Sequence, residues 1–290
     1  MEQEKGLSKP EWLKIRVPTG LADFQRIKQA MRKRGLVTVC EEAHCPNMGE
    51  CWQHESTATF MVMGDTCTRA CKFCNIKTHF PGKPLDPEEP RKLAEAIAEM
   101  GLDYAVITSV DRDDLKDQGA GHFAGCIAEI KRQHPSCHVE ALIPDFGRDA
   151  LKLVVDAKPD VIAHNIETTR ALTPTVRDPR AKYERSLAVL RMVKEMDKEV
   201  YTKSSIMLGL GEKEEDVMEA MDDLRAAGVD ILTVGQYLRP GGWNLPVVEY
   251  VRPEVFERYR SMGEEKGFAN ARGQEVEEFL LELTQRGCAR

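Results

Sequence analysis

The sequence predicts an α/β fold in which parallel strands alternate with helices packed against them. Short apolar runs alternate with longer amphipathic stretches along most of the chain, which is the pattern of a parallel sheet with outer helices. The chain has 290 residues, of which 42% are hydrophobic, and it contains no low-complexity linker. Because α/β barrels of roughly 200–250 residues form single domains, we expect one domain with extensions at both ends.

Six segments rich in apolar and β-branched residues are predicted as strands. They span residues 58–64, 103–110, 138–143, 160–166, 199–208 and 230–238. Stretches whose apolar residues recur every three or four positions are predicted as helices. They span residues 87–100, 120–133, 148–157, 180–196, 213–227, 253–266 and 274–286.

The carboxyl ends of parallel strands share one edge, and in barrels of this kind the side chains at that edge face the ligand. Reactive or polar side chains are predicted at the ends of five of the six strands. They are Cys67, Ser109, Pro144 with Asp145, Asn165 to Thr168, and Gln236 to Tyr237. We therefore expect the functional site at this edge of the sheet.

Composition excludes several classes of protein. A formal net charge of −7 and an isoelectric point near 5.6 argue against a nucleic-acid surface. The amino terminus lacks the apolar core of a secretion signal, and no segment has the apolar length needed to span a bilayer. Six of the nine cysteines fall into two tight triplets. We expect a cytoplasmic protein whose thiols are kept reduced.

The first of these triplets is Cys67-Thr-Arg-Ala-Cys71-Lys-Phe-Cys74. Three thiolates can hold three irons of a four-iron cubane, which leaves one iron without a protein ligand and open to chemistry. Structural zinc instead needs four ligands, commonly in paired C-x2-C knuckles. The C-x3-C-x2-C spacing matches the signature of radical S-adenosylmethionine (SAM) enzymes, although short cysteine runs also hold zinc or ferredoxin-type clusters.

The second triplet, Cys40, Cys45 and Cys51, has the spacing C-x4-C-x5-C. With His44 or His54 it could close a zinc site. A second iron–sulfur cluster is the other interpretation, and a cluster beside a reactive one could supply electrons or sulfur.

The two triplets and the motifs that follow them closely resemble the lipoyl synthase family. The match includes the segment from Thr38 to Trp52, which carries the second triplet, and the first triplet. It continues through Val106 to Leu115, Gly119 to Phe123, Ile143 to Phe146, His164 to Thr168, Tyr183 to Leu187, Tyr201 to Ser204, Gly209 to Glu212 and Gly235 to Pro240. Ordered matches thus extend from about residue 12 to about residue 268.

The resemblance implies a fold and a reaction. The fold would be the partial (β/α)6 TIM-type barrel of radical SAM enzymes, with amino- and carboxyl-terminal extensions. The reaction would insert two sulfur atoms, at C6 and C8, into an octanoyl group on a lysine of a lipoyl carrier domain. Those carbons bear no activating group, so their hydrogens must be removed by a radical, and one SAM molecule is consumed for each hydrogen.

The resemblance also implies cofactors and partners. Cys67, Cys71 and Cys74 would hold the SAM-cleaving [4Fe-4S] cluster, and Cys40, Cys45 and Cys51 would hold an auxiliary [4Fe-4S] cluster that donates sulfur. The carriers would be the E2 subunits of dehydrogenases and the H protein of glycine cleavage. The electron donor would be of the flavodoxin or ferredoxin type, and neither nucleic acid nor a membrane is expected as a partner.

Four further residues are candidates for the cofactor site by resemblance. Asn165 and Glu167 would contact SAM, while Arg185 and Lys203 could pair with carboxylates of SAM or shape the substrate site. Each has an alternative: Arg185 and Lys203 could form surface ion pairs, and Glu167 could cap the following helix. The sequence gives no residue that can be named as a catalytic acid or base.

Other marked residues favour structural roles. Gly209 and Gly211 are predicted in an ordinary turn before a helix. The charged run Asp111-Arg-Asp-Asp114 is predicted as a solvated loop, and Cys126 and Cys137 as small buried residues.

The expected organisation has three parts. Residues 1–56 would form an extension across the barrel mouth that carries the auxiliary-cluster ligands, 57–252 the barrel, and 253–290 a helical extension. In that last part the chain departs from its family, because the family's Arg-Ser-Ser-Tyr motif, whose serine is a ligand of the auxiliary cluster, is missing, and no serine follows Ser261.

Three consequences of the missing serine stay open. Cys288 or Thr284 could replace it, one iron could stay open to a small molecule, or the chain could turn over poorly. Two functions other than lipoyl synthase also stay open: radical SAM sulfur insertion into another substrate, and a metal-binding or electron-transfer protein that does not cleave SAM.

Overall fold

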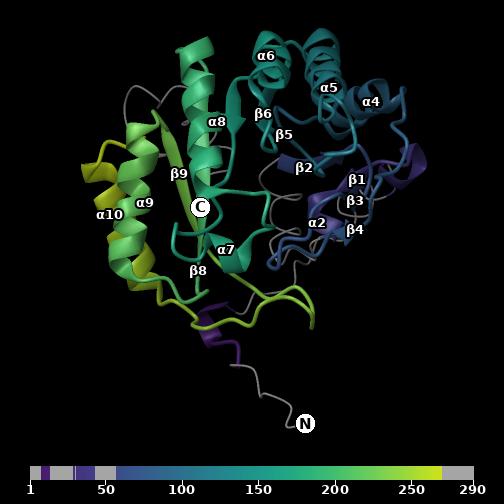
Figure 1. The fold of residues 1–290 in the computed structure, drawn as a ribbon. Helices are drawn as coiled ribbons and strands as arrows, with labels where there is room; N and C mark the ends of the chain where they lie inside the picture. The colour runs from purple at the N-terminus through teal and green to yellow at the C-terminus, as the bar shows by residue number, and fades with distance from the viewer. Residues whose placement is uncertain (1–7, 14–28, 30, 43–56, 270–290) are drawn as a thin grey trace.

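The computed structural model describes residues 8–13, 29, 31–42 and 57–269. Its centre is a seven-stranded sheet with the order β1-β2-β5-β6-β7-β8-β9 (Figure 1). The strands from β2 to β9 are parallel to their neighbours, and β1 is antiparallel to β2 at the edge. Their bounds are β1 Val37–Thr38, β2 Thr57–Val62, β5 Tyr104–Ser109, β6 His138–Leu142, β7 Val161–Ala163, β8 Tyr201–Leu208 and β9 Ile231–Gln236.

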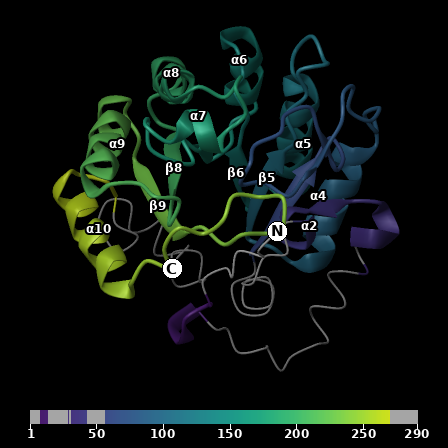
Figure 2. The ribbon, with the colours of Figure 1, turned by 60° about the horizontal axis from the view of Figure 1, so that its bottom comes forward.

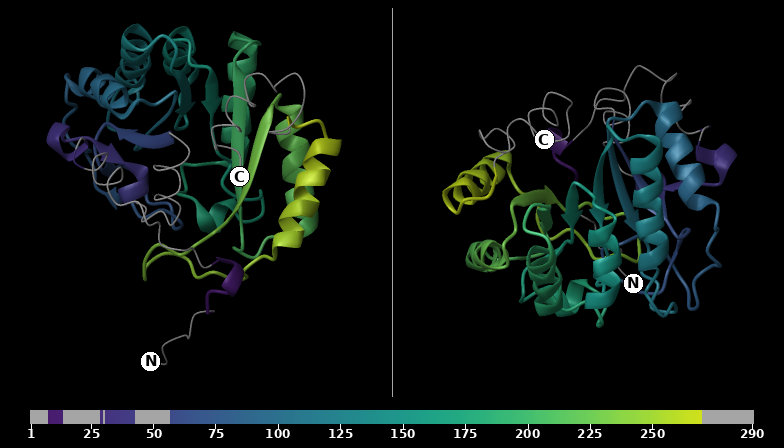
Figure 3. Two further views of the ribbon diagram at one scale, coloured as in Figure 1. Left: turned by 180° about the vertical axis from the view of Figure 1, so that it is seen from behind. Right: turned by 90° about the horizontal axis from the view of Figure 1, so that it is seen from above.

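Helices cover the outer face of this sheet and follow its curvature. Figure 2 shows them as an arc around the strands, from α4 at one end to α10 at the other, and Figure 3 shows the same arc from above. The main helices are α4 Glu89–Met100, α5 Ala120–Gln133, α6 Arg148–Asp156, α8 Tyr183–Met196, α9 Glu214–Ala226 and α10 Pro253–Glu265. Among the described residues no ladder joins β9 back to β2, so the curved sheet is a partial barrel.

Alternation along the strands separates the two faces of the sheet. On β8 the side chains of Thr202, Ser204, Ile206 and Leu208 are buried, and Ile206 and Leu208 pack with α8, α9 and α10. The intervening side chains of β8 are only half-buried and face the interior of the barrel, the lumen. The same rule places Met61, Thr108 and Leu142 on the lumen side of β2, β5 and β6, since their neighbours pack under α4 and α5.

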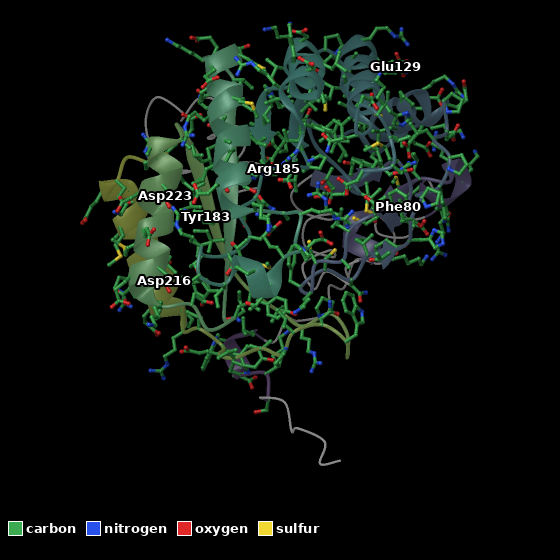
Figure 4. All side chains as sticks on the ribbon, viewed as in Figure 1. Phe80, Glu129, Tyr183, Arg185, Asp216 and Asp223 are labelled. Atoms are coloured by element: carbon green, nitrogen blue, oxygen red, sulfur yellow. The ribbon has the colours of Figure 1, made fainter. Side chains whose placement is uncertain are left out.

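Two apolar clusters hold the helices to the sheet. The larger joins β2, β5 and β6 to α4, α5 and α6, and includes an edge-to-face contact between Phe123 and Phe146. The smaller joins β8 to α8, α9 and α10. Figure 4 labels Tyr183 on α8 and Asp223 on α9, where the tyrosine hydroxyl donates a hydrogen bond of 3.0 Å to the carboxylate. These clusters fix the strand ends relative to one another.

The predicted strands and helices within the described residues are confirmed to within a few residues. The largest difference is β7, which ends at Ala163, although Glu167 makes one further parallel bridge to Ile206 of β8. Six short elements were not predicted: the 3-10 helix Glu11–Leu13, strand β1, α2 Val39–Glu42, α7 Thr173–Val176, and the paired strands β3 Thr66–Cys67 and β4 Lys77–Thr78.

Several expectations fall on residues outside the described part of the chain. They concern Cys45, Cys51, the helix at 274–286, Thr284 and Cys288. For Cys40, which lies in α2, the backbone alone is described. Within the described residues, no helix combines the length and the apolar character that crossing a bilayer requires.

Candidate active site

The three thiols of the first triplet lie on one loop, residues 67–78, which we call the cysteine loop. Strands β3 and β4 pair in parallel and close its base, and the backbone N–H of His79 donates to the carbonyl of Cys67. Parallel pairing places both loop ends at one point, so the residues between them form a compact projection. This projection follows β2 at the carboxyl edge of the sheet.

Distant segments hold the cysteine loop in place. Thr68 N–H donates to the carbonyl of Asp111 after β5, and Ala70 N–H donates to the carboxylate of Asp178 after α7, each at 3.0 Å. The side-chain amide of Asn244 donates to the carbonyls of Lys72 and Cys74 at 3.2 and 2.9 Å. The thiol positions are therefore set by three loops that follow β5, β7 and β9.

The donor set fits an iron–sulfur cluster held by three thiolates. Cys67, Cys71 and Cys74 are free thiols that line one cavity. Backbone N–H groups of Arg69 and Asp178 point at the sulfurs of Cys67 and Cys71, at 3.4 and 3.3 Å. Such N–H contacts stabilise cluster sulfurs and tune their potential. Within the described residues, these three are the thiols that line the cavity.

Burial keeps these thiols protonated in the absence of metal. It raises the pKa of Cys67 and of Cys71 to about 12, and it also raises the pKa of Cys74. At Cys67 the carboxylate of Asp111 adds to the rise. Binding of iron by thiolate must therefore displace protons, as is usual for metal sites built from cysteine.

Arg69, between two of the cysteines, is the centre of a buried charge cluster. Its guanidinium contacts Asp113 at 2.9 Å, Asp145 at 2.5 Å and Asp111 at 3.3 Å, and the residue is only 6% exposed. The prediction that residues 111–114 form a solvated loop is wrong, because Asp111 and Asp113 hold Arg69, and Arg112 is itself buried against Asp114 at 2.8 Å. One cation thus joins the ends of β2, β5 and β6.

Asp145 links this cluster to the end of β7. His164 Nε2 lies 3.2 Å from Asp145 Oδ1, while Nδ1 lies 2.8 Å from the carbonyl of Ile143 and therefore carries a hydrogen. Burial alone would raise the pKa of Asp145, but His164 and Arg69 outweigh it and hold that pKa below its usual range. Asp145 is consequently a buried carboxylate in its charged form.

Glu167 is held in an unusual backbone conformation beside Asn165. Its φ is +67°. Its N–H donates to the carbonyl of Ser205, and its carbonyl accepts from the N–H of Met207, both on β8. A residue other than glycine in the left-handed backbone region is strained, and such residues are common at ligand sites. Burial raises the pKa of Glu167, while Arg177 and a hydrogen bond from Asn165 oppose the rise.

These side chains surround a cavity of about 370 Å³ at the carboxyl edge of the sheet. The three thiols, Asn165 and Glu167 line it together, as do residues from the ends of β2, β5, β6 and β7. The volume lies in the range of small-molecule sites. The edge predicted from the sequence is therefore where the polar and thiol groups meet.

The other two candidates of the cofactor site lie elsewhere. Arg185, labelled on α8 in Figure 4, donates to the carbonyl of Asp145 at 2.6 Å and so supports a residue that lines the cavity. Lys203, near the start of β8, bonds both oxygens of Glu140 at 2.9 and 3.0 Å. Neither is among the residues that line the cavity.

The helix that carries Cys40 lies against this site. Val39 of α2 lines the cavity, and the side-chain amide of Asn75, next to Cys74, donates to the carbonyl of Glu42 at 3.3 Å. The backbone of Cys40 is therefore close to the first triplet, although the two segments are more than 20 residues apart in the sequence.

Gly209 and Gly211 form the turn that the sequence predicts. Both have φ near +100°, and the carboxylate of Glu212 accepts hydrogen bonds from the N–H groups of Gly209 and Leu210. A Cβ on Gly209 would lie 2.3 Å from the side chain of Gln236. These residues join the ends of β8 and β9 rather than line the cavity.

Sequence reasoning missed two residues of the site, Arg69 and Arg177. Arg177 is 7% exposed, lines the cavity, and donates to Ser186 at 2.9 Å. Its Nε has no partner among the described residues. The available signal was the charged run Arg177-Asp-Pro-Arg180 after a predicted strand end, but charge in a loop is usually solvated. Cys126 and Cys137 are buried, as predicted.

The partial barrel and its three-thiol cavity define the class of protein, a radical SAM enzyme. The Radical SAM superfamily model matches residues 61–224, and the model of the N-terminal domain of lipoyl synthase matches residues 1–45. Among solved structures, methylornithine synthase has a TM-score of 0.59 and 12% identity. The match covers 94% of this chain and 77% of that structure. The hydrogenase maturase HydG from Carboxydothermus hydrogenoformans has a TM-score of 0.57 and 14% identity. The match covers 90% of this chain and 69% of that structure.

Those two structures share the fold, and sequence relatives give the family. The lipoyl synthase of Anaeromyxobacter sp. (strain Fw109-5) is 58% identical over 262 residues, which are 90% of this chain and 88% of the relative. The lipoyl synthase of Thermus thermophilus is 54% identical over 288 residues, which are 96% of this chain and 88% of the relative. The chain belongs to the lipoyl synthase family, and it is a sulfur-inserting radical SAM enzyme that uses SAM and a [4Fe-4S] cluster.

Proposed function

We propose that this chain inserts two sulfur atoms, at C6 and C8, into an octanoyl group carried on a lysine of a lipoyl carrier domain. The observation that carries the proposal is the meeting of three thiols with Asn165 and Glu167 in one cavity, in a chain of the lipoyl synthase family. When bound, the cluster supplies the electron that splits SAM, which gives access to unactivated C–H bonds. The chain's own residues bind and orient the reactants and exclude water.

Cys67, Cys71 and Cys74 hold this cluster. Asn165 and Glu167 contact SAM, because they lie at the strand end facing the thiols and Glu167 is fixed by its bonds to β8. Arg185 acts on the same cavity through Asp145. Lys203 shapes the base of the lumen through Glu140, so its contribution to SAM binding is indirect.

Cys40, Cys45 and Cys51 hold a second [4Fe-4S] cluster that donates sulfur. The position of α2 supports this, because Val39 lines the cavity and Asn75 bonds Glu42. Two clusters at one cavity could both reach the same acyl chain. In this arrangement residues 1–56 carry the second cluster, 57–252 form the barrel and 253–290 are a helical extension.

The partners follow from the substrate. We infer that octanoylated E2 subunits of dehydrogenases and the H protein of glycine cleavage present the acyl group, and that a flavodoxin or ferredoxin supplies electrons. For the fourth iron of the second cluster, three alternatives stay open: Cys288 or Thr284 binds it, a small molecule binds it, or the chain turns over poorly.

Anaerobic reconstitution tests the cluster count. The protein is expected to hold about eight irons, because each cubane contains four. A content of about four irons, or tight binding of zinc in place of iron, would rule out the second cluster.

Incubation with SAM, dithionite and an octanoyl-lysine peptide tests the reaction. Release of 5′-deoxyadenosine is expected, together with a peptide whose mass has increased by two sulfur atoms. Cleavage of SAM without thiolated peptide would favour another substrate, which the missing Arg-Ser-Ser-Tyr motif makes the second candidate. A Cys288→Ala variant that inserts sulfur as well as the unchanged protein would remove Cys288 as a required ligand.

A further inference from the structure

The cavity has two chemically different walls. His164, Asn165, Glu167 and Arg177, which follow β7, present charged or hydrogen-bonding groups to it. Val39 of α2, Met61 of β2 and Leu142 of β6 present hydrocarbon. We call the first the polar wall and the second the apolar wall. A ligand that contacts both must combine a polar part with an aliphatic one, or two ligands must share the cavity.

Strand register makes the apolar wall continuous. Met61 is paired with Thr108 of β5, and Thr108 is paired with Leu142, so the three side chains stand in one row across the sheet. The hydroxyl of Thr108 donates to the carbonyl of Leu142 at 3.0 Å. Because that hydroxyl is already bonded, this residue can present its methyl group to the cavity, and the row offers no competing polar group to an alkyl chain.

A charged network lies directly beneath this row. Glu140 is on the same face of β6 as Leu142, two residues earlier, and is 4% exposed. It accepts hydrogen bonds from Lys203 at 2.9 and 3.0 Å and from the hydroxyl of Tyr104 at 2.5 Å. An alkyl chain that reached this depth would have to separate buried charges from their partners, which is strongly unfavourable. The lumen therefore changes from apolar to charged within two residues of β6.

We propose that the apolar wall binds the acyl chain of the substrate and that Leu142, above Glu140, sets the longest chain that the cavity accepts. The inference rests on the proposed function, from which the medium-chain acyl group comes. The alkyl chain lies along Val39, Met61 and Leu142, and the polar wall is left to polar groups. The boundary between Leu142 and the Glu140–Lys203–Tyr104 network limits the length of the acyl chain that fits.

Binding of acyl peptides tests this directly. Hexanoyl-, octanoyl- and decanoyl-lysine peptides with a fluorescent label are titrated into iron-reconstituted protein in the presence of SAM. The unchanged protein is expected to bind the octanoyl peptide best. Since one methylene in an apolar pocket changes binding by about tenfold or more, Leu142→Ala should raise decanoyl relative to octanoyl binding by about tenfold. Leu142→Phe should favour the hexanoyl peptide by a similar factor.

Leu153→Ala is the matched control, because it makes the same chemical change at a residue on α6 that is 44% exposed. Iron content and the thermal midpoint show whether each variant is folded, and Leu142→Val, which removes one methylene, is the replacement if Leu142→Ala is not. Equal affinity for the three lengths in the unchanged protein would overturn the proposal. A length preference that the Leu142 variants leave within about twofold of the original would also overturn it.

The outcome is separable from that of the proposed function. A length preference that shifts with Leu142 supports the apolar wall even if no sulfur is inserted into any peptide. Sulfur insertion into the octanoyl peptide together with an unchanged length preference would keep the function and reject the wall.

Discussion

The cationic side chains of Arg69 and Lys203 both neutralise carboxylates near the lumen, but they do so at opposite ends of it. At the carboxyl ends of the strands, which we call the rim, Arg69 joins Asp111, Asp113 and Asp145 from two different loops. At the amino ends, the floor, Lys203 bonds Glu140. The rim cation has partners that only the folded topology brings together, whereas the floor cation has a partner on a nearby strand.

The difference between rim and floor indicates which end of this barrel can carry the reactive groups. Floor contacts follow from strand register and close the lumen. Rim contacts depend on loops after β2, β5, β6, β7 and β9, and these loops also carry the thiols and Glu167. If this distinction is correct, matched substitutions at rim and floor should have effects of different kind as well as of different size.

The largest difference is expected between two cysteines. Cys71→Ala at the rim should remove a cluster ligand and abolish reductive cleavage of SAM, with loss of about four irons per chain. Cys137→Ala, just before β6 at the floor, should keep its iron because that thiol is buried away from the cavity. Iron analysis and assay of 5′-deoxyadenosine measure both. Equal iron content in the two variants would contradict the assignment of the first triplet.

The two cations give the next largest effect. Arg69→Met should lower the free energy of unfolding by about 3–5 kcal/mol, because three carboxylates lose their shared guanidinium partner, although Arg180 stays near Asp113 and His164 near Asp145. Lys203→Met leaves one buried carboxylate that still accepts from Tyr104, so about 1–3 kcal/mol is expected. Urea unfolding measures both values. If Lys203→Met raised the KM for SAM more than Glu167→Gln does, the Lys203 side chain would have to contact SAM directly.

Two carboxylates sharpen the comparison further. Glu167→Gln at the rim should raise the KM for SAM by about 10- to 100-fold, as loss of a hydrogen bond to a charged group costs about 1.5–3 kcal/mol. Glu140→Gln at the floor should lower the thermal midpoint and change the KM for SAM by less than about threefold. Steady-state SAM cleavage checks the KM values. The comparison fails if the two substitutions have the same effect on SAM.

The smallest difference is expected between two glycines. A Cβ on Gly209 at the rim would lie 2.3 Å from Gln236 Nε2 and 2.4 Å from the carbonyl of Glu249, so Gly209→Ala should cost about 2–3 kcal/mol. On Gly228 at the floor it would meet the flexible side chain of Lys194 at 3.2 Å. Both glycines have positive φ, so Gly228→Ala should cost about 1–2 kcal/mol. Differential scanning calorimetry should show the larger shift for Gly209→Ala.

Much of the rim was predictable because it follows from strand ends. Local periodicity placed β2, β5, β6, β8 and β9, and the parallel arrangement then brought Cys67, Asp145, Asn165 and Glu167 to one edge without further information. The cysteine spacing indicated iron, since residue type and spacing carry that chemistry directly.

Other contacts could not be predicted from local patterns. Arg69 and Arg177 are buried, although arginine in a loop is usually exposed. Their burial depends on carboxylates and hydroxyls that arrive from Asp113, Asp145 and Ser186, and sequence distance hides such partners. For the same reason the sequence did not distinguish Arg185, which supports Asp145, from Lys203, which lies at the floor.

The anchoring of the cysteine loop has a consequence for the order of assembly. Its partners Asp111, Asp178 and Asn244 are 43, 108 and 172 residues away from the groups that they bond. Contacts of such long range form late, because closing large loops is entropically costly before the intervening strands have paired. We expect the thiols to come together only after the sheet is complete, so that iron uptake during refolding lags behind the far-ultraviolet signal of secondary structure. Uptake that kept pace with that signal would show that iron gathers the loop first. If uptake lags as expected, metal capture is the final step of this chain's maturation, made on a scaffold that no longer needs iron in order to fold.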